Sequence, residues 1–250
     1  MIIYVIRSIL QNLIMGLPGV QAITEPLHST GMHGNTQAAH STFERFGVFV
    51  DVTDKDVLDI GPGQTPEVLG LAKAAGARAC KAVDIHVYLE AARAKNIGIE
   101  IQEYDGVHLP FADASFDIIW SNDVFEHVRA PEALVCECAR VLRTNGLFLA
   151  RIDLRDHYFL NDELRWLECL KYSDRLWHLM TSNRTAYVNR LRSSDWMLIF
   201  KRIGFRIVSF EARRSDVLTE AFVGDHIHAQ HALTAEDASI YAFDCVYQKV

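Results

Sequence analysis

The chain has 250 residues, of which 50% are hydrophobic and 23% are charged, and its formal net charge is -7. A chain of this length and composition can bury one α/β core and carry accessory segments. Its acidic balance lacks the basic excess that contacts with a phosphate backbone require. We therefore expect no nucleic-acid partner.

Five cysteines are spread along the chain without a CxxC pair: Cys80, Cys136, Cys138, Cys169 and Cys245. This odd number and wide spacing fit neither a disulfide framework nor a zinc knuckle. We interpret the cysteines as packing residues and expect a reducing, cytoplasmic location.

The first expected element is an apolar helix that ends near Gly16. Its polar residues recur on one stripe, at Arg7, Ser8, Gln11 and Asn12, which is typical of an amphipathic helix. The apolar run is too short and too interrupted to be a transmembrane segment. We expect this helix to dock on the domain or on a partner subunit, which would give a homodimer, with peripheral membrane contact as the alternative.

From about Thr53 onward, short apolar strands alternate with helical patterns, which is typical of a parallel sheet covered on both faces. The expected strands are residues 57–60, 79–85, 101–104, 116–121, 147–154, 207–210 and 240–248. One helix should begin at Pro131 and end at Asn145 and Gly146, and a later one should begin at Ser193 or Ser194.

The expected organisation is a helical extension over residues 1–50 and an α/β domain over 51–250. Residues 155–192 form an insertion rich in Trp, Tyr and Arg, which we expect to cap a binding pocket. The aromatic rings and polar donors of this insertion, together with Trp196 just after it, suit a polyhydroxylated ring. They are Trp166, Trp177, Tyr187 and Trp196, and Asn183, Arg184, Asn189 and Arg192.

A buried strand is followed by a glycine turn and a helix in the segment VLDIGPGQTPEVLGLAKAAG. Gly61 and Gly63 permit positive φ and a close approach of a ligand to the backbone. Asp84 ends the next strand, where a carboxylate can accept hydrogen bonds from both hydroxyls of a ribose. A dinucleotide-binding turn would have a third glycine where Pro66 stands, so an NAD-dependent dehydrogenase is disfavoured.

Several motifs occur in a fixed order over residues 55 to 155: DIGPGQ, AVDI, YDGVHLPF, ADASFDIIWSNDVFEHV and LRTNGLFLARIDL. Together they resemble the class I S-adenosylmethionine-dependent methyltransferase superfamily, specifically its small-molecule branch. The resemblance implies a Rossmann-like, doubly wound sheet of seven strands, with the last strand antiparallel. It also implies S-adenosylmethionine as the cofactor.

The resemblance also assigns cofactor-binding residues. It implies that Asp59, Gly61 and Gly63 line the methionine and ribose side of S-adenosylmethionine, and that Asp84 with the adjacent Ile85 holds the ribose. Asp105 and Gly106 would contact the adenine, and Asn122 would lie beneath the methionine moiety. The usual third glycine is replaced by Thr65, which leaves the detail of the turn open.

Methyl transfer to an alcohol requires alignment of the two reactants and a general base, most often histidine. His127 and His157 follow the carboxyl ends of two strands, where open α/β sheets bind ligands. Asp153 could orient His157 or raise its pKa. These three residues are the candidate catalytic groups.

Two metal sites were considered, and neither is favoured. Asp153, Asp156 and His157 resemble an oxygen-rich site for a divalent cation such as Mg²⁺, which could bind a sugar diol. The histidines at 226, 228 and 231 have metal-like spacing but fit an exposed loop.

The expected acceptor is a sugar hydroxyl of a saccharide or glycolipid. The insertion and the upstream HSTG segment resemble methyltransferases of bacterial polysaccharide and glycolipid gene clusters. Two alternatives stay open: a methyltransferase that acts on a quinone or lipid, and a protein that binds S-adenosylmethionine without turnover.

Overall fold

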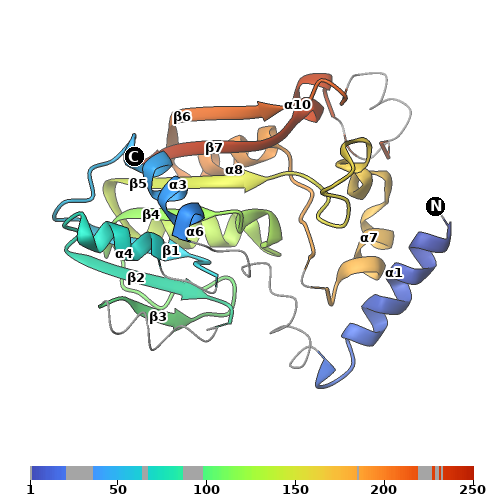
Figure 1. Cartoon of the computed structure of the whole chain (residues 1–250), viewed down its shortest axis with the longest axis horizontal. Coiled ribbons are helices and arrows are strands. Elements are labelled where there is room, and N and C mark those ends of the chain that lie inside the picture. The colour runs from blue at the N-terminus through green and yellow to red at the C-terminus, as the bar shows by residue number, and fades with distance from the viewer. Residues whose placement is uncertain are drawn as a thin grey trace. The chain divides into compact units, whose positions relative to one another are not determined.

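The structure is a computed structural model that describes residues 2–20, 36–63, 67–86, 98–184, 186–218, 227–228, 231 and 233–250 (Figure 1). The chain divides into two compact units. Unit 1 consists of Met1–Thr30, Asp153–Ser193 and Ala212–Ala242, and unit 2 consists of Gly31–Ile152, Ser194–Glu211 and Phe243–Val250. The N-terminal helix and most of the insertion therefore fall in the same unit.

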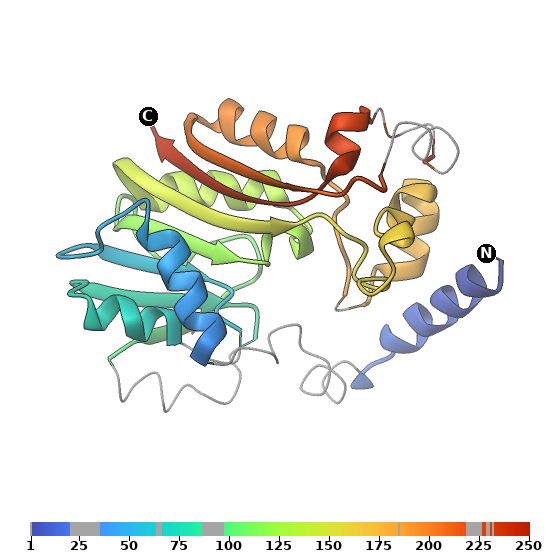
Figure 2. The same cartoon turned by 45° about the horizontal axis from the view of Figure 1, so that its top comes forward.

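The sheet has seven strands in the order β3-β2-β1-β4-β5-β7-β6. Strand β1 pairs in parallel with β2 and β4, and β5 continues the sheet in parallel beyond β4. The last strand, β7, lies between β5 and β6 and runs opposite to β5 (Figure 2). The predicted fold is confirmed. The strands are β1 (Asp56–Ile60), β2 (Ala79–Asp84), β3 (Glu100–Glu103), β4 (Phe116–Asn122), β5 (Leu142–Asp153), β6 (Phe205–Arg214) and β7 (Ile240–Lys249).

Four helices of unit 2 cover the two faces of this sheet: α3 (Thr36–Gly47), α4 (Glu67–Ala74), α6 (Pro131–Val141) and α8 (Ser193–Ile203). Helices α3 and α4 lie on one face, and α6 and α8 lie on the other (Figures 1 and 2). Phe46 of α3 stacks on Trp120 of β4, and Phe200 of α8 packs against Phe148 of β5. Because both faces are covered, the central strands consist almost wholly of buried residues.

Helix α6 is shorter than predicted, because it ends at Val141 and β5 begins at the next residue. The Asn145-Gly146 pair, expected to end the helix, lies inside β5 instead. Asn145 has a φ of +65°, as an Asn-Gly turn predicts, but the turn is an irregularity within the strand. Opposite β4, the register of β5 advances from Leu142 to Leu147 across this irregularity.

Unit 1 is mainly helical and irregular in its described residues. It contains α1 (Ile2–Met15), α7 (Asp174–Thr181), α10 (Ala235–Ser239) and the 3₁₀ turns η2 (Glu163–Arg165) and η3 (Glu168–Lys171). Its core includes Trp177, Met180 and Leu170, against which Tyr4 and Ile9 of α1 pack. Helix α7 begins at a Ser173 cap, whose side chain accepts a hydrogen bond from the backbone N–H of Leu176.

No helix among the described residues is both long enough and apolar enough to cross a membrane.

Gly146 allows a close approach of backbone that a larger residue would prevent. A Cβ there would lie 2.8 Å from the carbonyl oxygen of Arg143 and 3.1 Å from that of Asp117. Gly146→Ala should therefore lower the free energy of unfolding by about 2 kcal/mol in urea titrations. The control is Gly47→Ala, because a Cβ at Gly47 meets nothing within 4 Å. Equal stability of the two variants would contradict this prediction.

Candidate functional site

The turn after β1 requires glycine at its first position. Gly61 has a φ of +74° and Gly63 a φ of +69°, which side chains disfavour. A Cβ on Gly61 would lie 2.5 Å from a methyl carbon of Val124, which follows β4. The turn therefore brings the backbone of β1 directly against the loop after β4, as the glycine pattern predicts.

Asp84 ends β2 beside this turn. Its carboxylate accepts a hydrogen bond of 3.2 Å from the backbone N–H of Gly63 and one of 3.4 Å from that of His86. Burial raises the pKa of Asp84, while these backbone hydrogen bonds act in the opposite direction. Gly63 and Asp84, which are 21 positions apart in the sequence, are thus in direct contact, as predicted.

The loops after β2 and β3 meet near Ile85. This side chain is 50% exposed, and one of its methyl carbons lies 3.6 Å from where a Cβ on Gly106 would stand. Asp105 is also exposed, but its carboxylate accepts hydrogen bonds from the backbone N–H groups of Val107 and His108 and pairs with the His108 ring. Asp105 therefore stabilises its own turn, and the apolar surface here comes from Ile85.

Arg45 is a residue of this region that sequence reasoning missed. It lies on α3 and donates a 2.6 Å hydrogen bond to the side-chain oxygen of Asn122, at the carboxyl end of β4. It also forms an ion pair of 3.3 Å with Asp244 of β7. Asn122 in turn donates to the carboxylate of Asp123, which has a φ of +56°. A guanidinium group therefore lies next to the residue assigned to the methionine moiety.

Asp59 is buried at the end of β1, with a residue exposure of 6%. Burial is the main cause that raises its pKa from 3.8 to about 7, and the charge of Asp84 acts in the same direction. A carboxyl group that is neutral in the folded state at pH 5 therefore lies close behind the glycine turn.

The raised pKa of Asp59 makes stability depend on pH. The unfolded chain releases this proton near pH 4 and the folded protein near pH 7, so stability falls as pH rises between these values. In the wild type, the free energy of unfolding measured with urea should therefore be lower at pH 8 than at pH 5. Asp59→Asn should make this decrease smaller by on the order of 2 kcal/mol. An unchanged difference between the two pH values would contradict this prediction.

His127 lies in unit 2, in the 3₁₀ turn η1 (Phe125–His127) that follows β4. Its backbone N–H donates to the carbonyl of Val124, the residue that contacts the glycine turn. The histidine is half-buried. The turn therefore places it at the carboxyl edge of the sheet, as expected.

Asp153 and His157 belong to unit 1. The Nε2 atom of His157 and the Oδ2 atom of Asp153 are 3.8 Å apart, which is beyond hydrogen-bond distance. Asp153 is instead bound by Arg155, through contacts of 2.5 to 3.1 Å. Burial acts to raise the pKa of Asp153, but the Arg155 guanidinium outweighs it and the pKa is lowered. Asp153 therefore holds Arg155 in the structure rather than orienting His157 by a hydrogen bond.

Asp156, considered with these residues as a divalent-cation site, is fully buried. It accepts a hydrogen bond from the backbone N–H of Tyr158, and burial raises its pKa to about 7. A site for a hard cation would use ionised carboxylates, whereas this environment favours the neutral acid. Of the three histidines considered as a second metal site, His226 lies outside the described residues.

Much of the insertion expected to face an acceptor supports unit 1 instead. Trp177 is in the core of unit 1, and Trp196 is fully buried in unit 2, against Phe125. Arg192 is 4% exposed and donates to the carbonyl oxygens of Leu154 and Asp237. These three side chains therefore have structural roles, and irregular backbone needs internal donors such as Arg192. That the other residues of this set bind a sugar ring stays a prediction.

The comparisons with known proteins agree with this geometry. Residues 58–150 match the family described as a methyltransferase domain. The methyltransferase GfsG of Streptomyces halstedii is 37% identical over 106 residues, which cover 40% of this chain and 38% of that protein. The aligned stretches span 23% to 60% of the length of the curated relatives that the chain matches.

Solved structures show the same fold. An S-adenosylmethionine-dependent methyltransferase from Mesorhizobium loti aligns with a TM-score of 0.61 and 16% identity, over 86% of this chain and all of that one. The [4+2]-cyclase SpnF aligns with a TM-score of 0.57 and 15% identity, over 89% of this chain and 84% of that one.

The fold, the glycine turn and the domain match point to the same class of protein. Residues 58–150 match a methyltransferase domain, and the sheet has the fold of solved S-adenosylmethionine-dependent methyltransferases.

The residues at the sheet edge fit S-adenosylmethionine, the cofactor that the sequence resemblance implies. The glycine turn presents backbone without side chains, and the carboxylate of Asp84 lies beside it, where ribose hydroxyls can donate. Ile85 offers an exposed apolar surface of the kind that an adenine ring packs against.

Proposed function

We propose that the protein transfers the methyl group of S-adenosylmethionine to a sugar hydroxyl of a saccharide or glycolipid. The observation that best supports the methyltransferase part of this proposal is the contact between the Gly63 N–H and the Asp84 carboxylate. The acceptor rests on the resemblance of the insertion to enzymes of polysaccharide and glycolipid gene clusters. A cytoplasmic location is proposed from the scattered, free cysteines.

S-adenosylmethionine supplies, when bound, a methyl group on a cationic sulfur. Transfer forms a bond between this carbon and the acceptor oxygen and breaks the carbon–sulfur bond, so the hydroxyl group must lose its proton. In the proposal His127 or His157 accepts that proton. The residues that would hold the donor for this transfer are Gly61, Gly63, Asp84 and Asn122.

Asp84 should control cofactor affinity. Asp84→Asn keeps the shape of the side chain but removes the negative charge to which the ribose hydroxyls and the Gly63 N–H donate hydrogen bonds. The Kd for S-adenosylmethionine, measured by calorimetry, should therefore rise at least about tenfold. Asp113→Asn is the control, because this carboxylate is exposed and pairs with Arg140. Equal Kd values for both variants would show that Asp84 does not bind the cofactor.

The histidine base should affect turnover without affecting cofactor affinity. Loss of the base, through either His127→Ala or His157→Ala, should lower kcat by about 10²- to 10⁴-fold and leave the Kd for S-adenosylmethionine unchanged. The control is His178→Ala, since His178 is exposed on α7. Full turnover in both variants would exclude the histidine mechanism.

A quinone or lipid acceptor is the second candidate. The observation that favours it is the exposed apolar face of α1, which could bring the protein to a membrane surface. The third candidate is a protein of this fold without methyl transfer, since the structural neighbour SpnF is described as a cyclase.

The deciding experiment uses the full chain, S-adenosylmethionine with a labelled methyl group, and panels of sugars, glycolipids and quinones, with Mg²⁺ or with a chelator. A labelled sugar or glycolipid detected by mass spectrometry supports the proposal. A labelled quinone or lipid instead establishes the second candidate. Tight cofactor binding with no labelled product from any acceptor favours the third.

A further inference from the structure

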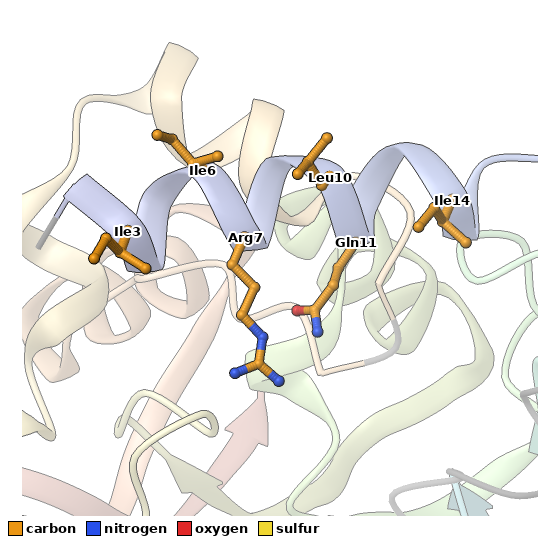
Figure 3. A pocket seen from close by; sticks show the side chains of 6 residues that line it. All are labelled: Ile3, Ile6, Arg7, Leu10, Gln11 and Ile14. Carbon is orange, nitrogen blue, oxygen red and sulfur yellow. The ribbon is translucent and has the colours of Figure 1, made fainter.

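Helix α1 exposes its apolar side although it packs on unit 1. Seven aliphatic side chains, on α1 and the turn after it, are each between 53% and 84% exposed: Ile2, Ile3, Ile6, Leu10, Leu13, Ile14 and Leu17. Four of them, with Arg7 and Gln11, line a groove of about 320 Å³ (Figure 3). All six described lining residues come from α1, so within the described part of the chain the groove is formed by this helix alone.

Hydrogen bonds fix the rotation of α1 about its axis. Asn12 is 3% exposed and donates to the carbonyl of Leu179 and the hydroxyl of Ser182. Its side-chain oxygen accepts from the backbone N–H of Asn183, whose side chain donates back to the carbonyl of Asn12. A rotation of α1 that turned Leu10 and Leu13 inward would break the hydrogen bonds of Asn12 and leave buried polar groups without partners. The apolar face therefore remains outside.

The exposed side chains follow the spacing of a helix-pairing seam. Ile3, Ile6, Leu10 and Leu13 all lie within α1 and are separated by three, four and three positions. This 3.5-residue repeat places apolar side chains along one line, which is the pattern by which one helix packs into another. We call these four residues the α1 seam.

The size of the exposed face matches an interface. Seven aliphatic residues exposed to this extent amount to on the order of 800 Å², above the few hundred Å² that monomers usually expose and close to the contribution of one partner to a standard protein interface. The face is therefore large enough for a stable partner.

Charge distinguishes a protein partner from a lipid surface. Helices that bind membrane surfaces carry Lys and Arg on their polar side, but α1 has no Lys and a single Arg, and its polar residues Ser8 and Asn12 are buried. Helix α1 itself has no acidic residue, so two copies of it do not repel each other through acidic groups.

We propose that the α1 seam binds the α1 seam of a second copy of this chain, which makes the protein a symmetric homodimer. In a symmetric pair the same patch is used on both copies. In a parallel pair of α1 helices about a two-fold axis, each seam residue packs beside its own counterpart, so Leu10 meets the Leu10 of the second copy. The pairing is independent of the acceptor, and its test measures mass rather than activity.

The test is sedimentation velocity on the full chain and on Leu10→Glu. The wild type should sediment at twice the mass of one chain. Leu10→Glu places two carboxylates opposite each other in an apolar seam, so it should weaken association at least about a hundredfold and give monomers. Leu198→Glu is the matched control, because Leu198 on α8 is 52% exposed and Leu10 is 55% exposed. It should remain a dimer.

A mixing experiment tests whether Leu10 meets itself. Leu10→Glu and Leu10→Lys should each be monomeric with circular dichroism spectra like that of the wild type, and an equimolar mixture should form a dimer. A mixture that stays monomeric overturns the proposed pairing. A monomeric wild type, or a Leu10→Glu variant that remains dimeric, also overturns it. A monomeric wild type that sediments with phosphatidylglycerol vesicles would assign the face to a bilayer.

Discussion

The left-handed turn at Gly61 and Gly63 is the constraint on which the candidate site depends. Because Gly61 has no Cβ, the backbone leaves β1 in contact with Val124, and the next N–H group reaches the carboxylate of Asp84. Strands β1, β2 and β4 are adjacent, so one turn brings the ends of all three together. The site therefore rests on backbone geometry, which central strands buried on both sides hold in place.

The parts of the site that the sequence predicted are those set by local pattern. A buried strand, a glycine turn and an acidic residue at the end of the next strand are enough to place Asp84 beside Gly63. Arg45 lacked any such signal, since it meets Asn122 across 77 positions and only through the packing of α3 on the sheet. The Asn145-Gly146 pair shows the opposite error, because its left-handed backbone was foreseen but assigned to the wrong element.

Two residues of the insertion have structural roles that its composition did not reveal. Its arginines and aromatic residues suggested recognition of a sugar, but Arg192 binds backbone carbonyls and Trp177 fills a core. A unit with few regular elements must satisfy its carbonyl groups with side-chain donors, so residues with this chemistry are needed whether or not a ligand binds. Composition alone does not separate these two uses, whereas burial and hydrogen bonding do.

The hydrogen bonds that anchor α1 have a consequence for the order in which the protein is made. Asn12 pairs with Asn183, which follows it by 171 positions. During synthesis from the N-terminus, α1 leaves the ribosome long before its anchor exists, and chains are made at only about 5 to 20 residues per second. For on the order of ten seconds or more, the nascent chain therefore exposes the apolar residues of α1 before the residues that anchor the helix have been made.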